Sequence, residues 1–271
     1  LLKGNYDPVR WSNFYGMGNQ SPFFSKPVNY FRLRTAEWLG SIGLSRTLGI
    51  NNFTLSGFYN SVRILRDANK FITNTYLPAH PENLRTNTFL GGSFKYGLFS
   101  VNDTIVPLSG VIFKAIASYT ENLSDAGKSF AKFGGDVQFY IPLIPKISLA
   151  ISTGAATITN TPEFYQYPAI GGGANLRGYI RDRFRGKTAF YNSNELRFIT
   201  NINTYFLRGK GGLVAFFDDG RVWMPGQSSN TLHTSYGGGI IIAPFNISFF
   251  NITYGVSNET TQIQLRGVMK L

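Results

Sequence analysis

Few residues of this chain have the types and the spacing that catalysis requires. The two histidines, His80 and His233, each lie in a segment that we expect to be a loop on the surface, and neither has a second ligand at the spacing of a zinc motif such as H-E-x-x-H. Gly186-Lys187-Thr188 resembles the end of a phosphate-binding loop, but Arg181 stands where that motif needs its first glycine. Gly16-Met17-Gly18 lacks the third glycine of a dinucleotide fingerprint and predicts a turn. We therefore predict no enzymatic activity, no metal site and no cofactor.

The most unusual stretch for binding chemistry is the glycine-rich, basic segment 171–188. Its cations are Arg177, Arg181, Arg183, Arg185 and Lys187. Basic residues interleaved with a few aromatic ones are weak support for nucleic-acid binding, and we predict none. A solvated basic loop is one interpretation of the segment. Contact with acidic lipid phosphates, through Arg181, Arg183, Arg185 and Lys187, is another.

The composition of the 271-residue chain restricts the elements that could position such residues. Lys and Arg number 26 against 14 Asp and Glu, which gives a formal charge of +12, yet only 15% of residues are charged. An average soluble domain has roughly 25%. Glycine, Phe and Tyr are abundant, cysteine is absent, and no stretch approaches the roughly 18 consecutive apolar residues of a membrane-spanning helix. The composition thus excludes a disulfide framework and helical membrane spans, and it favours aromatic-faced strands joined by turns.

Alternation of apolar and polar residues predicts antiparallel sheet along the whole chain. In one segment, for example, Val111, Phe113 and Tyr119 fall on one face and Lys114 and Ser118 on the other. About eleven such segments are predicted, with a weaker one before residue 18; they start near residues 29, 53, 87, 110, 130, 146, 188, 211, 233, 247 and 260.

The connections between these segments favour a transmembrane β-barrel over a soluble β-sandwich. Very short ones (142–145, 244–246) occur beside long polar ones, as in barrels with turns at one end and loops at the other; the long ones are 67–85, 120–128, 160–187 and 225–232. Aromatic residues near segment ends are typical of girdles at the membrane interfaces: Tyr30, Phe31, Trp38, Tyr140, Tyr205, Phe206 and Trp223. We expect an all-β, antiparallel transmembrane barrel, with a large soluble β-protein as the alternative.

Leu176-Arg177-Gly178-Tyr179 resembles the V/I/L-R-G-F/Y motif in the sixth extracellular loop of the BamA/TamA-type superfamily of outer-membrane insertases and two-partner secretion transporters. Glu195 falls on the strand just after that loop, and Phe216-Phe217-Asp218-Asp219-Gly220 on the next strand fits the F-x-D-x-G pattern of the family. About five strands follow the loop, as in the family. Tyr15-Gly16-Met17-Gly18-Asn19 also resembles a glycine-rich segment early in some of these barrels, but only residues 171–223 carry specific motifs.

The resemblance implies an ion-pair tether in the barrel lumen. Arg177 would bond to one or both carboxylates of Glu195 and Asp218, because a cation inside a lumen is costly without a partner. Gly178 would permit a close backbone approach, and Gly220 would let its strand bend or pack closely. Phe216, Leu176 and Tyr179 belong to the same motifs.

The resemblance also implies a function, a location and partners. The function would be insertion or assembly of outer-membrane proteins, or translocation of polypeptides, at a seam between the first and last strands. The closing strand would be 260–271, and Gly255 and Gly267 would weaken its pairing. The location would be the outer membrane of a Gram-negative-type bacterium, and the partners its lipids, unfolded clients and accessory assembly subunits. A passive anion-selective channel and a barrel that anchors a periplasmic enzyme domain outside this chain stay open as alternatives.

Barrels of that family have sixteen strands, whereas about eleven or twelve are predicted here. We expect residues 1–271 to form a single transmembrane barrel domain that is most of a sixteen-stranded barrel. No soluble N-terminal polypeptide-transport modules are expected within the chain.

Overall fold

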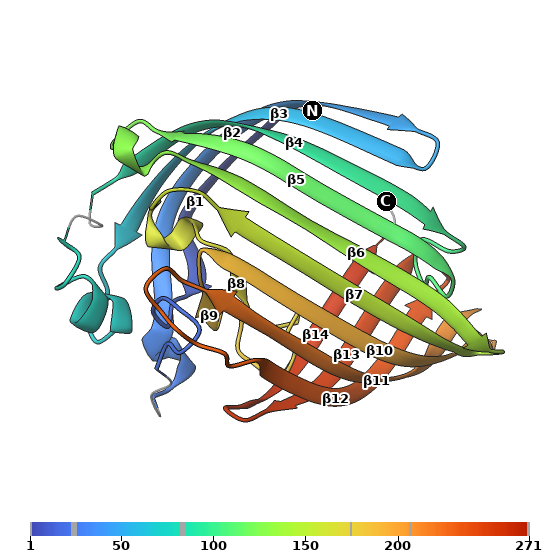
Figure 1. Ribbon diagram of the computed structural model, residues 1–271. Coiled ribbons are helices and arrows are strands. Elements are labelled where there is room, and N and C mark those ends of the chain that lie inside the picture. Colours follow the sequence, from blue (N-terminus) through green and yellow to red (C-terminus); the bar gives the residue numbers. More distant parts are fainter. Residues whose placement is uncertain (1, 23–25, 82–84, 174, 206–207, 270–271) are drawn as a thin grey trace.

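A computed structural model describes residues 2–22, 26–81, 85–173, 175–205 and 208–269 (Figure 1). Among these residues, twelve strands form one antiparallel sheet in which neighbours in the chain are neighbours in the sheet. They are β1 (Leu2–Asn13), β2 (Arg32–Leu48), β3 (Asn51–Leu65), β4 (Asn87–Val101), β5 (Gly110–Asn122), β6 (Phe130–Ile144), β7 (Ile147–Ile158), β10 (Thr188–Asn203), β11 (Arg208–Trp223), β12 (His233–Pro244), β13 (Ser248–Ser257) and β14 (Thr261–Met269). The predicted all-β antiparallel fold is confirmed, and the strands start within a few residues of the predicted positions.

The remaining elements are short and lie in the connections. Strands β8 (Ala169–Ile170) and β9 (Phe184–Arg185) pair with each other within the long loop, the name used here for residues 159–187. Single helical turns are Val28–Phe31, Ile72–Tyr76, Ala126–Lys128 and Phe164–Gln166. Among the described residues, no helix is both long enough and apolar enough to span a membrane.

The sheet curves around the long loop, so that β8 and β9 lie within its curve (Figure 1). The sheet has a loop end, where β1 finishes and β14 starts, and a turn end, where β1 starts and β14 finishes. No pairing joins β1 to β14 in the part of the chain that the structure describes.

The two faces of the sheet are inverted relative to those of a soluble protein. Large apolar side chains on the outer face are exposed, such as Leu44, Leu55, Leu213 and Leu265, whereas buried polar side chains on the inner face include Thr35, Ser93, Ser193, Asp218 and Thr253. An apolar outer surface with a polar interior is the pattern of a transmembrane barrel.

The predicted aromatic girdle is wrong for part of its members. Phe31 is buried in a cluster at the loop end, and Tyr30 packs against that cluster, because both lie in a helical turn and not in a strand. Tyr140 is buried on the inner face, where the guanidinium of Arg197 lies 5.4 Å from its ring. Trp38, Tyr205 and Trp223 are exposed; Phe206 lies outside the described residues.

Apolar clusters fill both ends of the lumen. At the loop end, the connections contribute Phe14, Tyr15, Phe31, Phe71 and Phe164 to one cluster. At the turn end, the connection between β4 and β5, residues 102–109, folds against the inner faces of the far strands, and we call it the inner plug. Its Val106 is fully buried in a cluster with Ile199, Val214, Ile241, Ala243 and Phe249. The inner plug is an exception to the short turns expected at this end.

Candidate functional site

Arg177 of the long loop lies in the lumen within a cage of acceptors. Its guanidinium donates to Asp218 through Nε (2.9 Å) and Nη2 (2.5 Å), and its backbone N–H donates to the same carboxylate (3.0 Å). Nη1 donates to Glu195, and Nη2 also donates to the hydroxyl of Ser193 (2.8 Å). The structure thus places Arg177 against both carboxylates that the sequence motifs single out.

A second arginine balances the charge of this cluster. Arg197 on β10 donates to the other oxygen of Glu195 through Nε (2.6 Å) and Nη2 (2.5 Å). Two arginines therefore face two carboxylates, and Asp218 has no exposed surface at all. Buried charges are tolerated when they are paired and hydrogen-bonded in this way. Burial alone would lower the pKa of Arg177, but the carboxylates of Asp218 and Glu195 outweigh it and raise that pKa above its ordinary value.

The register between β10 and β11 brings the carboxylates together. Ser193 pairs with Asp218, and Glu195 pairs with Phe216, so the four side chains form a square on the inner face. Side chains two residues apart on a strand share a face, which is why the alternating pattern of the sequence predicts this arrangement. The ring of Phe216 completes the cage, since the Arg177 guanidinium carbon lies 3.6 Å from its centroid.

The backbone on both sides of Arg177 is held by close packing. Leu176 is fully buried, and a Cβ added at Gly220 would lie only 2.7 Å from its Cδ1 atom. Gly178 has no room for a side chain either, because a Cβ there would lie 2.6 Å from the backbone of Val256. The Tyr179 hydroxyl donates to Asn258 (2.6 Å), and Ser257 donates to the carbonyl of Gly178 (2.9 Å). All four motif residues therefore contact the inner wall.

The predicted lipid contacts are wrong for Arg183 and Arg185. Both side chains are buried, Arg183 against Glu259 and Arg185 against the backbone carbonyls of Tyr165 (3.1 Å) and Tyr167 (2.9 Å). Burial lowers the pKa of the Arg185 guanidinium. The loop turns these two cations inward because they satisfy carboxylate and carbonyl groups that the folded loop would otherwise leave buried without donors.

The other two cations of the predicted lipid site are accessible. The Arg181 side chain is 79% exposed, at 3.8 Å from Asp182, and Lys187 is half-buried. Their contact with lipid phosphates stays a prediction.

At the loop end, the expected surface position of His233 is wrong, and the contacts of Asn19 were not predicted. His233 is buried at the start of β12, stacked on Phe184 with ring centroids 3.6 Å apart. Its Nε2 atom lies 2.9 Å from the carbonyl of Asn19. Asn19 also donates to the Thr231 carbonyl (2.7 Å) and accepts from the Val222 backbone (3.0 Å). The weak Tyr15–Asn19 match was the one sequence signal for this contact.

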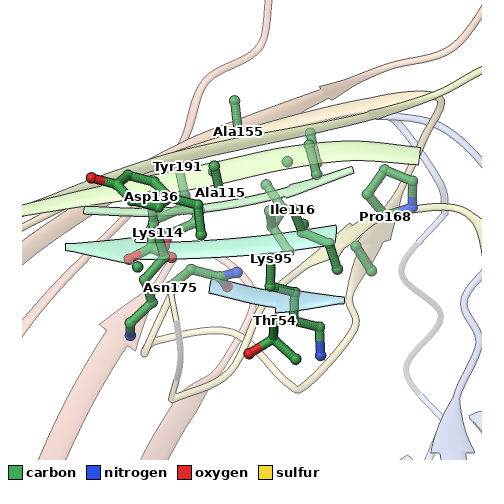
Figure 2. A pocket seen from close by; sticks show the side chains of 18 of the residues that line it. Thr54, Lys95, Lys114, Ala115, Ile116, Asp136, Ala155, Pro168, Asn175 and Tyr191 are labelled. Carbon is green, nitrogen blue, oxygen red and sulfur yellow. The ribbon is translucent and has the colours of Figure 1, made fainter. Parts of the chain in front are cut away.

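The long loop borders open space in the lumen. One cavity of about 690 Å³ is lined by the charged cluster and by Gln264 and Arg266 of β14. Another, of about 420 Å³, lies between the long loop and strands β3 to β7, and Figure 2 shows Lys95, Lys114 and Asn175 around it. The long loop therefore has open space on two sides, one towards β10, β13 and β14 and one towards β3 to β7. No group of three or more His, Asp or Glu residues that could hold a metal occurs in the described ranges.

Comparison with known proteins gives a family match and a structural match. The Omp85 superfamily domain matches residues 7–265. Among solved structures, the chain is similar to the crystal structure of BamA from Haemophilus ducreyi lacking POTRA domains 1-3, with a TM-score of 0.65 and 17% sequence identity over 87% of this chain and 54% of that one. The chain thus spans about half the length of that structure, and at this identity the likeness concerns the fold. No curated protein sequence matches the chain.

Proposed function

Because the chain belongs to the Omp85 superfamily, we propose that it is an outer-membrane β-barrel that inserts or assembles other outer-membrane proteins, or translocates polypeptides. The membrane is the outer membrane of a Gram-negative-type bacterium. The partners are its lipids, unfolded polypeptide clients and accessory assembly subunits. The work is conformational, and no step in it makes or breaks a covalent bond.

The observation that carries this proposal is the cage of acceptors around Arg177, which fixes the long loop against the inner wall. In the proposal a client strand forms its first hydrogen bonds at the outer edge of β14, with which no described residue pairs. An edge strand presents unpaired N–H and C=O groups for such bonds.

The tethered loop supports the wall beside this edge. The Arg177 carbonyl accepts from the side chain of Gln264 on β14 (3.5 Å), and the Gly178 carbonyl accepts from Thr260 at the start of that strand (2.8 Å). The cage around Arg177 fixes the loop, and these two bonds hold β14 in place against it. An edge held in a fixed shape templates an incoming strand at a smaller entropic cost than a mobile edge does.

Gly255 near the closing strand also has a packing role. A Cβ there would lie 2.8 Å from the backbone of Arg177, so this glycine makes room for the long loop. The pairing of β13 with β14 runs without interruption through Gly255 and Gly267, and the expected weakening of that pairing by the two glycines stays a prediction.

The apolar clusters at the two ends of the lumen favour this function over a passive channel. Apolar clusters occupy both the loop end and the turn end, and the inner plug is held by an ion pair between Asp103 and Lys210. A passive pore requires a continuous water-filled path, as in the open lumen of porins.

Site-specific photocrosslinking tests the proposal in the full-length native protein. A photoreactive residue replaces Leu265 on β14, and a matched variant carries it at Leu213 on β11; both leucines are exposed on the outer face, but β11 is paired on both edges. During client insertion into liposomes we expect crosslinks to the client from position 265 and few from position 213. Equal labelling at the two positions, or none at either, would contradict the proposal.

A further inference from the structure

We propose that Arg183 is a clasp that joins the two edge strands at the loop end of the sheet. Its guanidinium donates to Glu259, in the turn before β14, through Nε (2.6 Å) and Nη2 (2.8 Å). The same guanidinium donates to Ser21, in the connection after β1, through Nη1 to the hydroxyl (2.7 Å) and Nη2 to the carbonyl (2.8 Å). One side chain therefore bonds to both ends of a sheet whose edges do not pair with each other in the described part of the chain.

The environment of Arg183 makes this contact strong. The side chain is 1% exposed, and the rings of Tyr15 and Phe184 lie 5.2 and 4.5 Å from its guanidinium carbon. A bidentate pair of arginine and carboxylate is among the stronger hydrogen-bonded contacts, and lysine cannot reproduce its geometry. Removal of one partner leaves a buried charge without compensation, so the contact is costly to break.

Neighbouring bonds show that the long loop bridges the same two segments. Towards β1, the Gly18 backbone donates to the Arg185 carbonyl (2.7 Å), and the Asn13 side chain donates to the Arg181 carbonyl (3.0 Å). Towards β14, Ser257 and Thr260 donate to the carbonyl of Gly178. Arg183 adds to this bridge a side chain that contacts both segments at once.

The clasp keeps the loop end of the sheet together while the rest of the sheet moves, a consequence that rests on the proposed function. The connection after β1 and the turn before β14 keep their spacing as long as Arg183 bonds to both. Arg183 is in this sense a positioning residue, since it holds the strand ends and does not itself contact a client strand.

Hydrogen exchange measures the clasp without any client. The full-length protein in nanodiscs is compared with Arg183→Gln, Glu259→Gln and the matched control Arg181→Gln, whose side chain is exposed in the same loop. We expect the amides at the end of β1 and the start of β14 to exchange at least about tenfold faster in the first two variants and at the wild-type rate in the control. Arg183→Lys should fall between wild type and Arg183→Gln, because it keeps the charge but loses the bidentate geometry. Wild-type exchange in Arg183→Gln would overturn the proposal.

A milder variant keeps the test informative if Arg183→Gln does not fold. Ser21→Ala removes the hydroxyl acceptor and leaves the Glu259 contact, so we expect a faster exchange of a few fold that is confined to the β1 side. Heat-modifiable mobility in gels shows whether each variant is a folded barrel. Exchange in Ser21→Ala that is unchanged, or that rises equally across all strands, would count against the clasp.

A client-insertion assay on the same samples separates the clasp from the proposed function. Faster local exchange in Arg183→Gln, together with no client insertion by the wild-type protein, would leave the clasp in place and remove the function. Client insertion by the wild-type protein, together with unchanged exchange in Arg183→Gln, would keep the proposed function and remove the clasp.

Discussion

Gly178 of the long loop and Gly255 of β13 lie against each other with no side chain between them. A Cβ added at Gly255 would be 2.8 Å from the carbonyl carbon of Arg177 and 2.9 Å from the nitrogen of Gly178. The loop backbone therefore rests directly on the inner wall, and this contact sets the depth at which Arg177 meets Glu195 and Asp218. The glycine of the loop motif thus has a counterpart in the wall, 77 residues further along the chain.

Gly255→Ala should displace the long loop. The new methyl group overlaps loop backbone that cannot move without breaking the Arg177 contacts, so we expect a loss of about 1–3 kcal/mol in the free energy of unfolding. Urea titration of the refolded barrel measures it. Gly57→Ala on β3 is the matched control, since the nearest atom to its Cβ is 3.8 Å away; an equal effect of the two substitutions would contradict the close contact.

Asp218→Asn should destabilise the barrel strongly. The Arg177 guanidinium would stay buried with one carboxylate fewer, and breaking a buried pair from one side costs about 3–5 kcal/mol. Asp219→Asn is the control, because Asp219 is the next residue on the same strand and bonds only to Asn192 among the described residues (2.9 Å). Limited trypsin digestion at Arg177, which is buried in the native protein, should detect the released loop in the first variant alone.

The inner plug should limit ion conduction. Asp103→Asn removes the ion pair with Lys210, and Val106→Asp places a charge in the apolar cluster of the plug. We expect both variants to show larger and more frequent single-channel openings than the wild-type protein in planar bilayers. Wild-type conductance in both variants would show that the plug does not block the lumen.

The same ion pair predicts how conductance depends on pH. Burial raises the pKa of Asp103, but the Lys210 ammonium and the backbone N–H groups of Ile105 and Val106 outweigh it and hold that pKa below its ordinary value of 3.8. A carboxylate with a lowered pKa stabilises the fold above its ordinary pKa and loses this contribution as the pH falls through the lower, native value. Conductance of the wild-type protein should therefore be constant from pH 8 to about 5 and rise only below about 4. Asp103→Asn should lack this rise in conductance. A rise at neutral pH would show that a group other than Asp103 controls the conductance.

Binding of lipid phosphates should depend on Arg181 and Lys187 alone among the four cations of the predicted lipid site. Neutralising both should weaken lipopolysaccharide binding without changing the thermal unfolding of the barrel, because both side chains are accessible. Neutralising Arg183 or Arg185 should instead lower thermal stability, since both are buried. Unchanged lipopolysaccharide binding after neutralisation of Arg181 and Lys187 would remove the lipid site.

The sequence predicts what depends on strand periodicity. A period of two assigns each side chain to a face, so the strands and the inward direction of Glu195 and Asp218 follow from local patterns. The close packing at Gly220 follows from the family resemblance and not from the period. Contacts across the lumen cannot be predicted from such local patterns. The burial of Arg183 depends on Glu259, and the inner plug depends on β10 to β13, strands far away in the chain. Phe31 shows the same limit, because the cluster that buries it is built from connections far apart in the chain.

The rate of client folding tests the central claim most directly. A radiolabelled outer-membrane protein client is added to liposomes that contain the full-length native protein or its Arg177→Ala variant, with single-channel conductance recorded for both. The account predicts faster client folding with the native protein and loss of that acceleration in Arg177→Ala, whose barrel still shows folded mobility in gels. A client that folds equally fast with or without the native protein, together with a steady anion-selective conductance, would contradict it.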